Sequence, residues 1–141
     1  MNIDLTGKFA LVCGSTRGIG KSIAVQLALS GATLTLLARD EEALKKSVFD
    51  LDSSKGQIHN YLVCDFLKPL LLQEIVESFI SKQKTIHILV NNTGGPPPGT
   101  IENATSDQFI NAFNAHLLCN HILAQAVIQG MKHEKYGRII N

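Results

Sequence analysis

The chain has 141 residues, which is the size of one ordinary domain and is enough to bury roughly two-thirds of its unfolded surface. Hydrophobic residues make up 45%, charged residues 18%, and the net charge is +1, so the composition argues against a disordered segment and against a basic surface for nucleic acid. The start, Met1-Asn2-Ile3-Asp4, does not resemble a signal peptide, and no apolar run approaches the roughly 20 residues of a membrane helix. We therefore expect one cytoplasmic domain that binds neither nucleic acid nor a membrane.

The cysteines and histidines are spaced in a way that predicts no metal site. Cys13, Cys64 and Cys119 are far apart, odd in number and each within an apolar run, which favours reduced thiols in the core. The five histidines are scattered, and none pairs with another ligand at a metal-binding spacing.

Short apolar runs alternate along the chain with amphipathic ones. The apolar runs predict buried parallel strands at residues 8–13, 33–38, 58–64, 86–90 and, as an opening only, 137–141. Helical spacing predicts helices from the first glycines to residue 30, from 40 to 56, from 69 onward and from 105 to about 131. This alternation predicts an α/β fold: a doubly wound, Rossmann-like parallel sheet in three αβα layers, with strand order 3-2-1-4-5 and truncated at the fifth strand.

Two of the predicted helices carry further signals. The helix after Asp40 has two acid–base pairs at i,i+4, Glu41 with Lys45 and Glu42 with Lys46. The helix from 105 begins with a capping box, in which Thr105 is followed three residues later by Gln108. Its apolar side chains occupy more than one face, so we expect exposed apolar surface and a homo-oligomer; they are Phe109, Phe113, Leu117, Leu118, Ile122 and Val127.

The stretch Gly14-Ser15-Thr16-Arg17-Gly18-Ile19-Gly20 joins the first predicted strand to the first helix. Such a turn directs free backbone N–H groups and the positive end of the helix dipole at one point, which suits a phosphate. Gly14 would allow the tight turn, Gly18 would let a pyrophosphate approach, and Gly20 would let the helix pack close to the strand. The alternative is a turn that binds nothing, since the spacing differs from the fingerprint Gly-x-Gly-x-x-Gly.

Residues 91–99 read Asn-Asn-Thr-Gly-Gly-Pro-Pro-Pro-Gly and fit neither a helix nor a central strand. One interpretation is a stiff connector. The other is a ligand loop, because the stretch lies at the carboxyl end of a predicted strand, where open α/β sheets bind their ligands.

The glycine stretch, Asp65, Asn91-Asn92-Thr93-Gly94 and Asn114 together resemble the short-chain dehydrogenase/reductase family over nearly the whole chain. Cys13 stands where the family often has Thr, and Thr93 where Ala is usual. The resemblance implies that Asp65 holds the adenine edge, that residues 91–94 lie along the ribose and nicotinamide, and that Asn114 contributes to a proton relay. The implied cofactor-binding set is Gly14, Ser15, Thr16, Arg17, Gly18, Ile19, Gly20, Arg39, Asp65, Phe66, Asn91, Asn92, Thr93 and Gly94.

The end of the second predicted strand bears on the choice of cofactor. A ribose 2′-hydroxyl is usually met there by Asp or Glu, but Ala38 and then Arg39 stand in that region. Arg39 and Arg17 would suit a 2′-phosphate, because guanidinium groups make charge-assisted, bidentate bonds to phosphate. We therefore expect NADP rather than NAD. The alternative is that Arg39 lies on a solvated surface with Asp40.

The family's catalytic Ser and Tyr-x-x-x-Lys do not occur in this sequence. They follow the fifth strand in the family, whereas Tyr61 is followed four residues later by Asp65 and Tyr136 by Ile140. We expect the cofactor-binding half of an NADP(H)-dependent oxidoreductase, similar to 3-oxoacyl-carrier-protein reductases, acting on a carbonyl/alcohol pair and inactive by itself. The alternatives are a non-catalytic dinucleotide-binding or subunit-assembly module, and a defective fragment.

Overall fold

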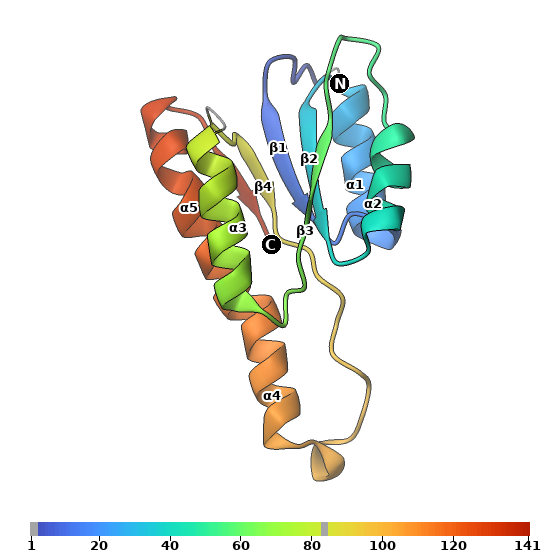
Figure 1. Ribbon diagram of the computed structural model, residues 1–141, viewed down its shortest axis with the longest axis vertical. Helices are drawn as coiled ribbons and strands as arrows, with labels where there is room; N and C mark the ends of the chain where they lie inside the picture. The colour runs from blue at the N-terminus through green and yellow to red at the C-terminus, as the bar shows by residue number, and fades with distance from the viewer. Residues whose placement is uncertain (1–2, 83–84) are drawn as a thin grey trace.

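The computed structural model describes residues 3–82 and 85–141, so Met1 and Asn2 of the N-terminal stretch considered above lie outside the described residues. Five strands form one parallel sheet in the order β3-β2-β1-β4-β5, which confirms the predicted topology (Figure 1). The strands are β1 (Phe9–Cys13), β2 (Thr33–Ala38), β3 (Asn60–Val63), β4 (Ile88–Val90) and β5 (Arg138–Ile140).

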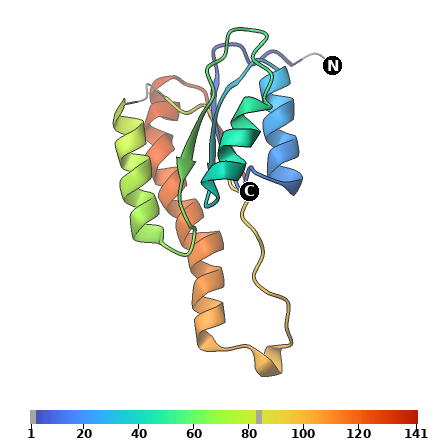
Figure 2. The same ribbon diagram turned by 45° about the vertical axis from the view of Figure 1, so that its right-hand side comes forward.

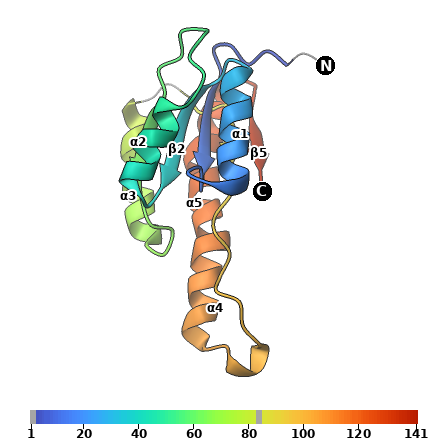
Figure 3. The same ribbon diagram turned by 90° about the vertical axis from the view of Figure 1, so that its right-hand side faces the viewer.

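Helices cover both faces of the sheet. The helices α1 (Gly18–Leu29) and α2 (Glu41–Phe49) pack on one face, and α3 (Pro69–Lys82) and α5 (Cys119–His133) on the other (Figure 3). Side chains of β1 alternate between the two cores: Ala10 and Val12 face α1, while Leu11 and Cys13 face α3 and α5. Because both faces of the three central strands β1, β2 and β4 are covered, these strands are mainly apolar runs rather than alternating ones.

The long helix predicted from residue 105 is interrupted. The Thr105–Gln108 capping box is present and begins α4 (Ser106–Phe113), but a π-helical segment, η2 (Asn114–Leu118), separates α4 from α5. The extra residue of a π turn rotates the helix, so the buried side chains of η2 and α5 are Ala115, Cys119, Leu123, Val127 and Met131.

Of the six apolar side chains expected on more than one face of this helix, Phe109 and Phe113 on α4 and Leu117 in η2 are exposed, at 58%, 56% and 60%. Val127 is instead buried in the core. With the loop after β4 and the short 3₁₀ helix η1 (Ile101–Asn103), α4 extends beyond the end of the sheet (Figure 2).

The prediction that α2 extends to Gly56 is wrong. The helix ends at Phe49, and the Asp52 carboxylate then accepts hydrogen bonds from the Ser54 N–H at 3.2 Å and the Ser54 hydroxyl at 2.7 Å, which forms a turn instead. Of the two predicted ion pairs, Glu41–Lys45 forms at 3.5 Å, whereas Glu42 pairs with Lys45 at 2.8 Å rather than with Lys46.

The three cysteines are free and buried, as predicted. Burial raises the pKa of the Cys13 thiol to about 12 and that of the Cys119 thiol to about 11, so both remain protonated at neutral pH. Within residues 3–82 and 85–141, no helix combines the length and the apolar character that crossing a membrane requires.

Candidate functional site

A groove of about 890 Å³ lies at the carboxyl ends of the strands, where β1 and β4 lead into loops. From β1 the chain first adds β2 and β3 on one side of the sheet and then β4 and β5 on the other. Open α/β sheets bind ligands at the point where this direction changes. The groove brings together most of the residues that the sequence analysis assigned to a cofactor: Gly14, Thr16, Arg17, Gly18, Ile19, Arg39, Asp65, Phe66, Asn92, Thr93 and Gly94.

The glycine turn has the backbone that the sequence predicts. Gly14 and Gly18 have φ angles of +57° and +56°, a region that other residues avoid. A Cβ on Gly20 would collide with the Gly14 carbonyl, so the helix does pack close to the strand, whereas a Cβ on Gly18 would meet nothing within 4 Å. Arg17 precedes α1 without making a side-chain cap, which leaves N–H groups of the first turn available to an anion.

The two asparagines after β4 have different positions. The Asn92 amide donates to the carbonyls of Cys13 and Gly14, at 3.3 and 3.4 Å, and thus holds the glycine turn against β4. Asn91 is buried away from the groove; its N–H donates to the Ile140 carbonyl and its amide to the Asn141 side chain, both at 2.8 Å. Asn91 therefore fixes β5 beside β4 rather than lining the groove.

Ser15 and Gly20 are also buried and do not line the groove. The Ser15 hydroxyl is fully buried and has no hydrogen-bond partner within residues 3–82 and 85–141. A buried hydroxyl without a hydrogen-bond partner destabilises the folded state unless a group outside the described residues bonds to it. Ser15 lies in the same turn that presents free N–H groups.

Two exposed guanidinium groups border the groove. Arg17 and Arg39 form no ion pair with any residue of the described chain. The Asp40 carboxylate accepts the Ala43 N–H at 3.0 Å and caps α2. Arg39 and Asp40 are both exposed, which is compatible with a phosphate ligand for Arg39 and also with the alternative of a solvated surface. Ala38 ends β2, which leaves no carboxylate at that position.

Asp65 lies in the loop after β3, on the groove wall. Its carboxylate accepts the Leu67 N–H at 3.0 Å, which fixes the turn that also carries Phe66. Within residues 3–82 and 85–141 the second carboxylate oxygen accepts no hydrogen bond, which leaves it available to a ligand.

The π-helical segment contributes a residue that the sequence analysis missed. His116 lines the groove, and its Nδ1 lies 2.8 Å from the Thr93 hydroxyl. The two residues are 23 apart in sequence, and nothing in the pattern pairs them. Asn114 begins the same segment, is half-buried and does not line the groove.

Residues 8–141 match the family model for short chain dehydrogenases. The chain belongs to the short chain dehydrogenase family. It is 32% identical over 138 residues to the 3-oxoacyl-[acyl-carrier-protein] reductase FabG of Haemophilus influenzae, an alignment that covers 97% of this chain and 55% of that protein. It is 31% identical over 140 residues to the 7alpha-hydroxysteroid dehydrogenase of Clostridium sardiniense, covering 97% and 53%.

Solved structures agree with this assignment. The L-sorbose reductase of Gluconobacter frateurii, complexed with NADPH and L-sorbose, has a TM-score of 0.89 at 29% identity, with 99% of this chain and 53% of that chain covered. A metagenomic short-chain oxidoreductase in complex with NADP has a TM-score of 0.87 at 28% identity, with 97% and 61% covered. The chain thus spans about half the length of the relatives it matches and corresponds to the region of the fold that binds the cofactor in such oxidoreductases.

Proposed function

We propose that this chain is the cofactor-binding portion of an NADP(H)-dependent oxidoreductase acting on a carbonyl/alcohol pair. The observation that carries the proposal is the position of Arg17 and Arg39, two exposed guanidinium groups without ion pairs among the described residues, beside the free N–H groups of α1. With no carboxylate at the end of β2, this corner of the groove suits a 2′-phosphate better than a 2′-hydroxyl.

The remaining groove residues fit the other parts of a dinucleotide. The open space above Gly18 suits a pyrophosphate, Asp65 offers a carboxylate to an amino group at the adenine edge, and Asn92-Thr93-Gly94 borders the opposite end. When bound, NADPH would supply a hydride to a carbonyl carbon. The chain's own contribution is to bind and orient the cofactor; the proton-transferring Tyr and Lys of the family have no counterpart in residues 1–141.

Fluorescence titration with NADPH and with NADH tests the proposal. We expect NADPH to bind more tightly by about 1.5–3 kcal/mol, the range for hydrogen bonds to charged groups, which corresponds to roughly 12- to 150-fold in affinity. Arg39→Ala should remove most of this preference while leaving NADH affinity nearly unchanged.

Lys46→Ala is the matched control, since it removes one exposed positive charge that does not line the groove. It should retain the preference. Equal affinities of the wild-type chain for NADPH and NADH, or an unchanged preference in Arg39→Ala, would overturn the role given to Arg39.

A second candidate is a subunit-assembly module, which the exposed Phe109, Phe113 and Leu117 favour. It is compatible with dinucleotide binding, because two of these side chains lie on α4 and one on η2, and none of them lines the groove. We further propose a homo-oligomer and a cytoplasmic location; three free cysteines, all buried, support the latter.

A further inference from the structure

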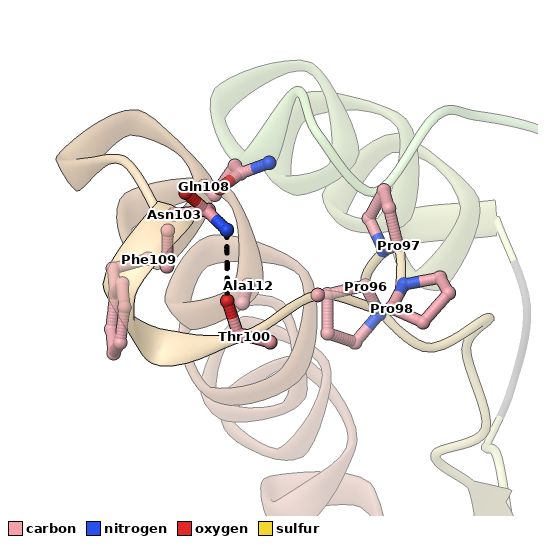
Figure 4. A pocket seen from close by; sticks show the side chains of 10 residues that line it. Pro96, Pro97, Pro98, Thr100, Asn103, Gln108, Phe109 and Ala112 are labelled. Carbon is pink, nitrogen blue, oxygen red and sulfur yellow. Dashed lines mark hydrogen bonds between the residues drawn. The ribbon is translucent and has the colours of Figure 1, made fainter.

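A second cavity, of about 340 Å³, lies between the loop after β4 and the start of α4 (Figure 4). Pro96-Pro97-Pro98 of the loop and Phe109 and Ala112 of α4 line it (Figure 4), and Ala104 lines it as well. The volume falls within the range of roughly 300–1,000 Å³ that is typical of small-molecule sites. The dinucleotide does not account for this cavity, since Ala104 and Phe109 lie outside the groove.

The walls offer a ligand mainly apolar surface. The Asn103 amide donates to the Thr100 hydroxyl at 3.0 Å, and the Gln108 side-chain oxygen accepts the Thr105 N–H at 2.9 Å, so these two groups at the rim already have partners. Phe109 lines the cavity and is 58% exposed, so a ligand in the cavity would cover part of it. Three consecutive prolines restrict the backbone of the opposite wall, which limits the entropy lost on binding.

The cavity is continuous with the dinucleotide groove. Pro96-Pro97-Pro98, Gln108 and Ala112 line both spaces, and the same groove continues to Thr93 and Gly94. A molecule whose oxygen-bearing end lies near Thr93 can therefore extend an apolar end over the prolines to Phe109.

We propose that this cavity binds the apolar portion of the carbonyl substrate, and that the substrate is an aliphatic ketone or aldehyde rather than a small, fully polar sugar. The inference rests on the proposed function, because it places the reacting end of the substrate in the dinucleotide groove. It adds a substrate class and a specificity determinant, the paired walls of Pro96–Pro98 and Phe109.

A series of 2-alkanones from 2-butanone to 2-decanone tests the inference by ligand-observed NMR, with the full chain and saturating NADP⁺. Burial of one methylene is worth about 0.8 kcal/mol, so affinity should rise by up to roughly fourfold per added carbon until the cavity is filled. Because the cavity is preformed, the same dependence on length is expected without NADP⁺.

Ala104→Phe fills the cavity from a residue that does not line the groove, and its backbone, at φ −74° and ψ 129°, accepts a phenylalanine. It should abolish the dependence on chain length and leave NADP⁺ affinity unchanged. Ile110→Phe is the matched control, since Ile110 is 55% exposed on α4 and lines neither space; it should behave as the wild type. Phe109→Ala, which opens the wall, should weaken 2-decanone and leave 2-butanone unaffected.

Affinities independent of chain length, or an unchanged series in both Ala104→Phe and Phe109→Ala, would overturn the inference. If the wild-type chain did not bind NADP⁺, that result would contradict the proposed function instead. The series measured without NADP⁺ would still decide whether the cavity binds an apolar ligand.

Discussion

Replacing two glycines of the same turn by alanine separates backbone strain from close packing. Gly14 and Gly18 have nearly the same positive φ, so alanine at either position costs about 1–2 kcal/mol in backbone conformation. At Gly14 the new Cβ would also collide with the Asn92 carbonyl and lie 2.9 Å from the Asn92 amide nitrogen, and such overpacking costs about 1–3 kcal/mol more. At Gly18 it would meet nothing within 4 Å.

We therefore expect Gly14→Ala to lower the free energy of unfolding by about 2–5 kcal/mol and Gly18→Ala by only about 1–2 kcal/mol. Urea denaturation of each variant measures the difference. Gly99→Ala is the control, because its φ is not positive and its Cβ would have open space; it should change stability by less than about 0.5 kcal/mol. Equal destabilisation at Gly14 and Gly18 would refute the close approach of Asn92 to the turn.

Three further predictions concern pH, turnover and association. Burial, reinforced by the charge of Lys8, lowers the pKa of His87 below its usual 6.5, so the unfolded chain binds a proton more readily than the folded chain. The free energy of unfolding, measured by urea denaturation, should therefore fall as the pH decreases from about 7.5 to about 5. The decrease should be smaller in His87→Gln than in His121→Gln, the control at an exposed histidine. The 141-residue chain should not oxidise NADPH with carbonyl substrates above background, since neither tyrosine precedes a lysine by four residues; oxidation proportional to protein concentration would contradict this. Sedimentation should detect oligomers, because the side chains of Phe109 and Phe113 are more than half exposed. A stable monomer at tens of micromolar would contradict the prediction that this apolar surface drives association.

The sheet could be predicted from sequence because burial on both faces leaves a local pattern. Residues 33–38 form a continuous apolar run that breaks only at threonines, and β2 has those bounds in the structure. The end of α2 could not be predicted in the same way. Leu51 is buried and continues the apolar spacing of Leu44 and Val48, so the pattern runs past the point where the Asp52 turn ends the helix.

The candidate site was predictable where it is local and not where it depends on the tertiary fold. The glycine turn is one continuous stretch of sequence, and so is the loop after β4. Residues of both line the groove. The contact between Thr93 and His116 joins two distant elements, and the π-helical turn that brings His116 there leaves no signature in apolar spacing. For the same reason, the sequence did not distinguish Asn91, which fixes β5, from Asn92, which fixes the glycine turn.

Mapping of NADP⁺ binding by amide NMR tests the central claim most directly. If the groove holds the dinucleotide, the largest shifts on addition of NADP⁺ should fall at Gly14–Gly18, Arg39, Asp65 and Asn92–Gly94, at the carboxyl edge of the sheet. His59 and His87, whose rings accept backbone N–H groups at the start of β2 and β1, should be unaffected. No shifts at saturating NADP⁺, or shifts centred on those two histidines, would contradict the account.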